Sequence, residues 1–553
     1  MEFYAKLLDS MTKALPVAAL PVSREYRCGS ALRGEVFAFQ LAYRSGSEKL
    51  DGIRIETEGE LAAALRIRQV GLIPTELPAT CFDENVLSTE PGLFPDPLTD
   101  VPPEGVTAYA GQCRSLHFQL AVPPEQAAGK YEFKLRLTHP ERGILCEKEF
   151  TLEVVGATLP PQRVERTEWF YCDCLASIYK CELWSGEFWE ILERYFRNMT
   201  GHGITQILTP LVTPPLDTAV GTERPTVQLL DIETDGNGRW SFGFERLKRW
   251  VELARRCGFR RFEFAHLFSQ WGAECAPKVM AKTPEGVRRV FGWETDAASK
   301  EYTAFLEAML GALRGFIREN GLEKSCCMHV SDEPQPKDFD RYREHLALVR
   351  RATGDEIPVC DALSHPGLLE PDENGYPVTI IQRIPAFRAA GVSPLWAYYC
   401  CGPETGTTNR FLHYPGARIR GLGIQLFHYG IAGFLHWGYN FWYSRLSRRV
   451  IDPWRSPDAG GEFPGGDPFL VYPGTGGVPV DSLRNELMRE AFQDIRALEL
   501  LASLAGGRER ADEILLELCG GTLSVTDFPV TSEAFSQLRH AVNMRIKALK
   551  HNG

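Results

Sequence analysis

Two adjacent carboxylates, Asp332 and Glu333, follow a short apolar run and are well suited to acid–base chemistry. The run CCMHV at 326–330 reads as a buried strand, and Pro334 ends it because proline has no N–H for sheet pairing. If this strand belongs to a parallel α/β sheet or barrel, its carboxyl end lies where binding and catalysis are usually built. The alternative is an acidic turn that caps the next helix.

Such a pair could cleave a glycosidic bond, which needs an acid for the leaving oxygen and stabilisation of an oxocarbenium-like centre. The predicted strand at 432–442 contains no Asp or Glu that could act as a separate nucleophile. This absence favours a mechanism in which the 2-acetamido group of the substrate attacks. Asp332 would then orient and polarise the acetamido N–H, while Glu333 would act as general acid and then general base. A competing hypothesis keeps a separate carboxylate, Asp173 or Asp361, roughly 5–9 Å from Glu333.

The elements that must position this pair alternate between strand and helix after residue 164. Strands are predicted at 169–174, 204–210, 259–268, 326–332, 357–362, 393–401, 432–442 and 466–474. Strong helical periodicity in segments such as 244–259 and 302–321 predicts helices between them. The fold class is therefore α/β, and the alternation fits a (β/α)8 TIM-like barrel over 164–505. An open doubly wound sheet is the alternative, but no glycine-rich phosphate loop follows the first strand.

Residues 1–158 have a different pattern, with short alternating runs bounded by glycine, proline or acidic turns. These runs are 35–44, 52–59, 115–124, 131–139 and 150–156. They predict an N-terminal β-sandwich domain. The proline-rich segment 84–105 is predicted to be an irregular loop that reaches over a neighbouring domain, and 157–163 to be a linker. Residues 506–553 are predicted to form a short helical appendage.

If the barrel is right, acidic, amide and aromatic side chains converge at the mouth formed by the strand ends. The candidate substrate-binding residues are Asp173, His266, Trp271, Tyr398, Tyr399, Trp437 and Asn440. Such a mixture suits a polyhydroxylated ligand. Structural explanations compete: Trp437 could be a core aromatic residue, and Asp173 could cap a helix. Tyr398 and Tyr399 face opposite ways on a strand, so at most one reaches the mouth unless the strand has ended.

Composition and charge exclude several classes of protein. The 553 residues are 44% hydrophobic and 24% charged, as in an ordinary globular protein. A net charge of −11 argues against nucleic acid as the main partner. No apolar run approaches the ~18 residues of a membrane-spanning helix, and the N-terminal stretch is not a signal peptide. The 15 scattered cysteines read as reduced thiols, so we expect a cytoplasmic protein.

The sequence predicts no metal and no cofactor. His329, Asp332, Asp361 and His365 could be pictured around an ion, but no HExxH or CxxC spacing occurs. No GxSxG motif is present to support a serine hydrolase.

Several motifs resemble a known enzyme family. They are SDEP at 331–334, QWGAECAPK at 270–278, GFLHWGYNFW at 433–442, GDPFLVYPG at 466–474, PLVTPPLDT at 210–218 and GLFPDPL at 92–98. The chain resembles the domain of unknown function 4091 group, the catalytic domain of glycoside hydrolase family 123, over nearly its whole length. That family comprises β-N-acetylgalactosaminidases.

The resemblance implies a retaining exo-β-N-acetylgalactosaminidase that uses neighbouring-group participation, with the family's Asp-Glu pair at Asp332 and Glu333. It also implies an acetamido pocket lined by aromatic residues, for which Tyr399, Trp437 and Tyr398 are the candidates. The expected partner is an oligosaccharide or glycoconjugate with a terminal β-linked N-acetylhexosamine. Many relatives are secreted, whereas this chain shows no export signal. A non-catalytic glycan-binding protein is the third hypothesis, and the oligomeric state stays open, with a homodimer as one option.

Overall fold

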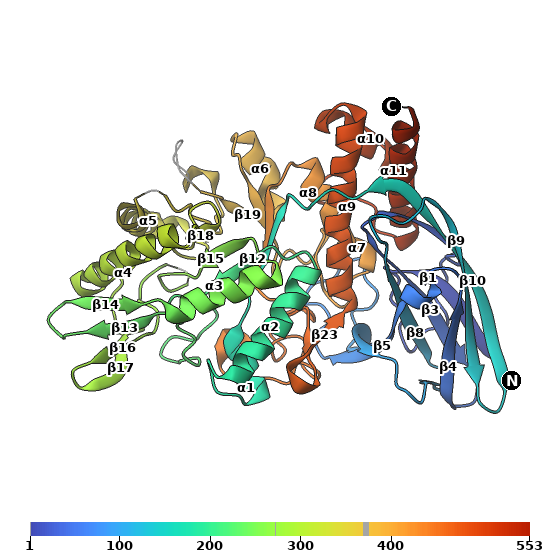
Figure 1. Ribbon diagram of the computed structural model, residues 1–553, viewed down its shortest axis with the longest axis horizontal. Helices are drawn as coiled ribbons and strands as arrows, with labels where there is room; N and C mark the ends of the chain where they lie inside the picture. The colour runs from blue at the N-terminus through green and yellow to red at the C-terminus, as the bar shows by residue number, and fades with distance from the viewer. Residues whose placement is uncertain (1, 271, 355, 369–374, 553) are drawn as a thin grey trace.

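The computed structural model describes residues 2–270, 272–354, 356–368 and 375–552. A β-sandwich lies at one end of the molecule and a mixed α/β region at the other, with the long helix α9 (Leu483–Ala505) between them (Figure 1). Among the helices of these described ranges, none combines the length and apolar character needed to cross a membrane.

The sandwich consists of two sheets that share one apolar core. The five-stranded sheet has the order β2 (Cys28–Arg33), β10 (Gly143–Thr158), β9 (Gly129–His139), β4 (Leu50–Glu58) and β7 (Val106–Ala108). The seven-stranded sheet has the order β1 (Phe3–Asp9), β3 (Val36–Ser45), β8 (Cys113–Ala121), β5 (Arg66–Thr75), β6 (Gly92–Asp100), β23 (Pro479–Ser482) and β22 (Tyr472–Pro473). Phe39 and Phe150 join the sheets by stacking with ring centroids 4.2 Å apart.

Two predictions concerning this region need correction. The segment 84–105 is not irregular throughout, because Gly92–Asp100 forms β6. The predicted eighth barrel strand, 466–474, contributes only β22, which pairs antiparallel with β23 and extends the sandwich. The residues before β6 do contact the neighbouring region, since the Leu87 N–H donates to the His413 carbonyl at 2.8 Å.

The α/β region is built on a curled sheet of seven parallel strands. Their order is β19 (Val378–Ile380), β20 (Trp396–Tyr398), β21 (Gly433–His436), β11 (Glu165–Glu168), β12 (Gln206–Thr209), β15 (Arg261–Phe264) and β18 (Cys326–Met328). Single bridges, Met328–Val359 and Ala362–Val378, link the edge strands β18 and β19 to the segment between them. Within the described residues, seven regular strands thus form a curled half-barrel, and a complete eight-stranded barrel is not confirmed.

The first strand of this sheet differs from the predicted 169–174. The strand is Glu165–Glu168, and the chain then enters helix α1 (Cys172–Tyr179). The buried strand was missed because it carries charges: the Arg166 guanidinium lies 2.7 Å from Glu168 with both side chains inaccessible. The predicted strand at 357–362 makes only isolated bridges.

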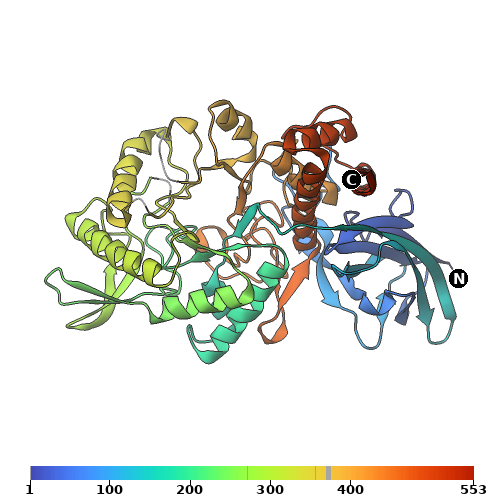
Figure 2. The same ribbon diagram turned by 45° about the horizontal axis from the view of Figure 1, so that its top comes forward.

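Helices surround the parallel sheet, and a small sheet projects from it at the left of Figure 2. The helices are α2 (Gly186–Gly201), α3 (Glu245–Cys257), α4 (Lys300–Glu319), α5 (Phe339–Thr353), α6 (Ile384–Ala389), α7 (Gly416–Arg420) and α8 (Leu422–His428). The projecting sheet has the order β14 (Trp240–Gly243), β13 (Asp231–Thr234), β16 (Val279–Thr283) and β17 (Gly286–Phe291). The 3₁₀ turns are η1 (Ala62–Ala64), η2 (Pro336–Asp338), η3 (Pro366–Leu368), η4 (Ile381–Arg383), η5 (Arg445–Ser447) and η6 (Thr475–Gly477). Ser185 and Ser299 cap α2 and α4 with their side chains.

The C-terminal helices α10 (Arg508–Leu518) and α11 (Ser532–Asn552) pack beside α9. Arg539 of α11 forms ion pairs with Glu35 of the sandwich at 2.9 Å and with Asp494 of α9 at 2.8 Å. The helical C-terminus therefore contacts both the sandwich and α9. The proposed boundaries between domains stay a prediction.

Candidate active site

Asp332 and Glu333 lie just beyond the carboxyl end of β18, where the chain leaves the parallel sheet. Glu333 has a φ of +44°, a left-handed conformation that costs a non-glycine residue on the order of 1–3 kcal/mol. The hydroxyl of Tyr398, the last residue of β20, donates a hydrogen bond to Glu333 Oε1. The ends of two strands therefore bring together the Tyr398 hydroxyl and the carboxylate of a residue with a strained backbone, Glu333.

Asp332 is buried and is linked through an amide to a third carboxylate residue. Gln270 Nε2 donates to Asp332 Oδ2 at 3.2 Å, and Gln270 Oε1 accepts from the Asp217 N–H at 2.9 Å. Burial raises the pKa of Asp332 well above its ordinary value, and the negative charges of Glu333 and Asp217 raise it further. Asp332 therefore holds its proton more tightly than an exposed aspartate does.

Asp217 was missed by sequence reasoning. It lies in the long loop after β12, has a φ of +52°, and accepts a hydrogen bond from the Tyr171 hydroxyl at 3.0 Å. Burial raises the pKa of Asp217, and the charge of Glu333 acts in the same direction. The available signal was its position in PLVTPPLDT (210–218), one of the motifs that carry the family resemblance.

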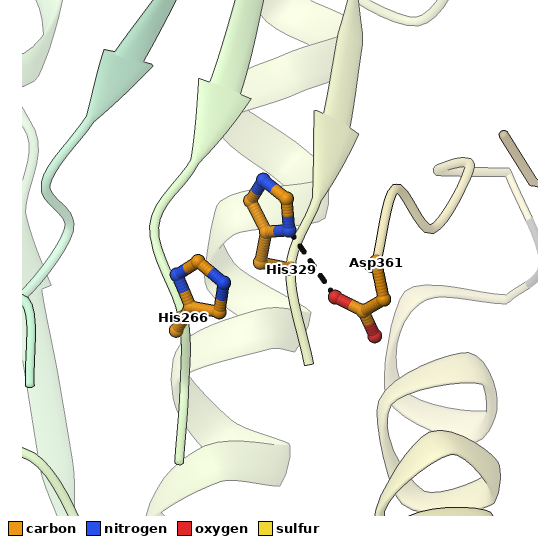
Figure 3. Close-up of side chains that lie close together, drawn as sticks. All are labelled: His266, His329 and Asp361. Carbon is orange, nitrogen blue, oxygen red and sulfur yellow. Dashed lines mark hydrogen bonds and ion pairs between the residues drawn. The ribbon is translucent and has the colours of Figure 1, made fainter. Parts of the chain in front are cut away.

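Behind these residues lies a buried row of alternating charges formed by Glu263, His329 and Asp361. His329 Nδ1 is 3.2 Å from Asp361 Oδ1 (Figure 3), and His329 Nε2 pairs with Glu263 Oε1. Burial alone would lower the pKa of His329, but the two flanking carboxylates raise it to about 10. The ring is therefore an imidazolium at neutral pH.

His266 lies beside His329 at the end of the neighbouring strand (Figure 3), with ring centroids 4.2 Å apart. Burial lowers the pKa of His266 well below its ordinary value, and the charge of His329 adds to this. His266, His329 and Asp361 are close enough to suggest a metal site. However, His329 directs both ring nitrogens at carboxylates, and an imidazolium has no lone pair for a metal. This donor set suits an ion-paired support better than a metal centre.

Another close group, His202, Asp481 and Glu486, lies between the sandwich and α9. Arg68 lies 2.9 Å from Asp481 and 2.5 Å from Glu486, and Arg489 also pairs with Glu486, so two arginines already balance these two carboxylates. The group thus serves as a buried ion-pair network at the contact between the two regions.

The structure separates the two neighbouring tyrosines. Tyr398 reaches Glu333, whereas Tyr399 is fully buried and directs its hydroxyl to Met488 Sδ of α9 at 3.3 Å. Trp437 is half-buried, and its Nε1 donates to Asp467 Oδ2 at 3.1 Å. Burial raises the pKa of Asp467 to about 7.

Asn440 and Asp173 are linked to the Asp217 carboxylate indirectly, through Tyr171 and Arg224. Asn440 makes two hydrogen bonds to the backbone of Tyr171: it accepts from the N–H at 2.9 Å and donates to the carbonyl at 3.0 Å. Asp173, in the first turn of α1, lies 3.7 Å from Arg224, whose guanidinium sits over the Tyr171 ring. Trp271 lies outside the described residues. Asn440 thus contributes to the site through Tyr171, which in turn contacts Asp217.

Comparison with solved structures finds an extensive match to a family 123 enzyme. A family 123 glycoside hydrolase from Clostridium perfringens, studied for glycolipid glycan hydrolysis, aligns with a TM-score of 0.76 and 13% identity over 100% of this chain and 98% of that chain. Two β-glucuronidases have low TM-scores. The Ruminococcus gnavus enzyme gives 0.31 at 11% identity, over 82% of this chain and 65% of its own. The Dictyoglomus thermophilum enzyme gives 0.33 at 8% identity, over 82% and 66%.

No curated protein matches the sequence. The family model for the glycoside hydrolase 123 catalytic domain matches residues 169–501, which include six of the seven strands of the parallel sheet, the Asp332–Glu333 pair and most of α9. The resemblance noted in the sequence is thereby confirmed. The chain belongs to glycoside hydrolase family 123.

Proposed function

We propose that this glycosidase is a retaining exo-β-N-acetylgalactosaminidase that works by substrate-assisted catalysis. The observation that carries the proposal is the adjacent Asp332–Glu333 pair, in which each carboxylate has its own partner. Gln270 contacts Asp332, and Tyr398 contacts Glu333. Two neighbouring acids held by different elements can take different roles in one reaction.

In the first step, Asp332 accepts a hydrogen bond from the acetamido N–H and orients the group. The acetamido carbonyl oxygen then bonds to the anomeric carbon as the glycosidic bond breaks, which forms an oxazolinium ring. Glu333 gives its proton to the leaving oxygen. In the second step, Glu333 takes a proton from water, whose oxygen bonds to the anomeric carbon and reopens the oxazolinium ring. The sugar leaves with its original anomeric configuration.

Asp332 matters most when the acetamido nitrogen becomes positive. A buried carboxylate interacts with such a charge more strongly than one in water, because less solvent screens the pair. The raised pKa of Asp332 fixes the direction of the pH dependence, because the ionised carboxylate is lost as pH falls through that raised pKa. The proposal therefore predicts that activity declines on the acid side at a higher pH than an ordinary aspartate would give.

The proposed substrate is an oligosaccharide or glycoconjugate with a terminal β-linked N-acetylhexosamine, the galactosamine configuration being preferred. Tyr398 and the half-buried Trp437 are the proposed aromatic residues of its pocket. The test is a screen of aryl β-glycosides of GalNAc, GlcNAc, galactose and glucose, together with a thiazoline mimic of the oxazolinium intermediate. Hydrolysis of the acetamido sugars alone, blocked by the thiazoline, is expected. Efficient hydrolysis of the unsubstituted sugars without thiazoline inhibition would contradict the mechanism.

Asp217 gives a specific reason to test a second candidate, a glycosidase with a separate carboxylate nucleophile. Burial raises the pKa of Asp217 and the charge of Glu333 raises it further, so the two carboxylates lie close enough to interact. The earlier candidates are engaged elsewhere, Asp361 with His329 and Asp173 with Arg224. A 2-fluoro glycoside that labels Asp217 covalently would favour this second candidate. Glycan binding without turnover of any substrate in the screen would favour a non-catalytic binding protein.

A further inference from the structure

One oxygen of the Asp217 carboxylate is unused by the protein. The Tyr171 hydroxyl donates to Oδ2, and none of the described residues donates to Oδ1. Asp217 is only half-buried, and Oδ1 is not among the described side-chain atoms that are both buried and unpartnered. This oxygen is therefore accessible. A carboxylate oxygen in this state can accept a hydrogen bond from a ligand.

Three separate segments fix the position of Asp217. Its N–H donates to Gln270 Oε1 at 2.9 Å, its carbonyl accepts from Ser447 Oγ at 2.5 Å, and its carboxylate accepts from Tyr171. The backbone is held at a φ of +52°, which a non-glycine residue adopts only when its surroundings enforce it. A strained backbone conformation within a long loop is often found at residues that bind ligands.

Tyr171 is itself fixed. Asn440 makes two hydrogen bonds to its backbone, and the Arg224 guanidinium lies 5.3 Å from its ring centroid. The orientation of the Asp217 carboxylate is therefore set before any ligand arrives, which lowers the entropy lost on binding.

Asp217 is also tied directly to the proposed catalytic pair. The single amide of Gln270 contacts both the Asp217 backbone and the Asp332 carboxylate. A sugar ring held by Asp332 at its acetamido group and by Glu333 at its glycosidic oxygen would present its remaining hydroxyls to the nearby walls.

We infer that Asp217 is a substrate-binding residue whose Oδ1 accepts a hydrogen bond from a ring hydroxyl of the terminal sugar. The inference rests on the proposed function, because it assumes that a sugar occupies the site of Asp332 and Glu333. It adds a third carboxylate with a role in specificity rather than in bond cleavage.

The test combines the isosteric variant Asp217→Asn with substrates that lack single hydroxyls. Aryl β-GalNAc and its 3-, 4- and 6-deoxy analogues are compared by kcat/KM. For the wild type, one deoxy analogue should lose roughly 10- to 100-fold, the range for a hydrogen bond to a charged group. Asp217→Asn should lose a similar factor on the parent substrate and little more on that same analogue. The variant should remain sensitive to the other two deoxygenations.

Asp458→Asn is the matched control. Asp458 is a buried loop aspartate whose carboxylate accepts from Ser456 Oγ at 2.7 Å and the Gly461 N–H at 3.0 Å. It should leave the pattern of preference among the four substrates unchanged. Tyr171→Phe removes the donor to Asp217 but keeps its carboxylate, so a smaller loss on the same hydroxyl is expected.

Equal losses of Asp217→Asn on all four substrates would overturn the inference, as would a wild type indifferent to every deoxygenation. The wild-type series needs no variant, so a folding defect cannot hide the answer. Calorimetric binding of GalNAc and its deoxy analogues reports on the hydroxyl contact without turnover. Loss of turnover with intact, Asp217-dependent binding would contradict the proposed function alone, and labelling of Asp217 by a 2-fluoro glycoside would overturn the binding role.

Discussion

The rim carboxylates (Asp332, Glu333 and Asp217) and the buried charge row (Glu263, His329 and Asp361) use the same residue types in opposite ways. In the row, a cation lies between two anions, and Glu263 accepts further hydrogen bonds from Thr167, Trp169 and Gln206. At the rim, three carboxylates influence one another, and two of them have left-handed backbones. His329 and Asp332 are nevertheless only three residues apart.

The difference teaches how to separate support from function in a carboxylate-rich site. A buried charge with a full set of partners stabilises one arrangement and has no capacity left for a ligand. Neighbouring carboxylates that repel one another and have unused acceptor oxygens raise the free energy of the empty site. Such repulsion is retained in proteins where a ligand relieves it. The predictions below test whether the two groups behave as differently as their contacts indicate.

The largest expected effect is on catalysis at the rim. Glu333→Gln should lower kcat/KM for natural glycosides by about 10²–10⁴-fold, because the leaving oxygen loses its proton donor. Activated aryl glycosides, whose leaving groups need no proton, should be much less affected. Asp332→Asn should impair both classes of substrate, since the acetamido group is no longer oriented. Equal and small effects of the two variants, measured by steady-state kinetics, would refute the assigned roles.

In the buried row, the largest effect should be on stability. His329→Gln removes the cation between Glu263 and Asp361 and leaves two uncompensated buried carboxylates. The free energy of unfolding should fall by about 3–5 kcal/mol, as for other broken buried ion pairs. Chemical denaturation measures this loss, and Asp332→Asn serves as the control because it relieves like-charge repulsion. A variant as stable as the wild type would show that the row is not a structural support.

The same row predicts a specific pH dependence of stability. The pKa of His329 is raised to about 10 by its carboxylate neighbours, from roughly 6.5 in an unfolded chain. A raised pKa means that its contribution is complete below the unfolded value and is lost as pH rises through about 10. The stability difference between wild type and His329→Gln should therefore shrink above neutral pH. A difference that grows between pH 7 and 10 would contradict an imidazolium in the row.

The sequence was informative about elements with a clear apolar period and less so about those that carry charge. The strands around 206–209, 261–264 and 326–328 were expected from hydrophobic runs, and Asp332 and Glu333 follow the last of these. The strand Glu165–Glu168 was predicted at 169–174 instead, because side chains in buried ion pairs are charged and give no hydrophobic pattern.

The run 466–474 is apolar for a different reason than the one inferred. The Tyr472 hydroxyl donates to Asp96 of the sandwich and the Phe469 carbonyl accepts from Arg484 of α9, and local periodicity cannot tell which sheet an apolar strand joins. Asp217 could not be found from periodicity either, because it lies in a long loop and its neighbours Tyr171, Gln270 and Ser447 come from distant segments. Long-range contacts of this kind leave no spacing in the sequence.

The smallest effect should separate two residues that adjoin in sequence, Tyr398 and Tyr399. Tyr398→Phe removes the hydroxyl that donates to Glu333, and a lost hydrogen bond to a charged group should lower kcat/KM by roughly 10-fold or more. Tyr399→Phe removes only a weak contact with Met488 Sδ and should leave kcat/KM within about twofold. The two substitutions are chemically identical, so unequal effects must come from the different partners of the two hydroxyls, Glu333 for Tyr398 and Met488 for Tyr399. Equal effects would mean that the Tyr398 hydroxyl does not act through Glu333, and the rim would then need a different donor to hold its strained carboxylate.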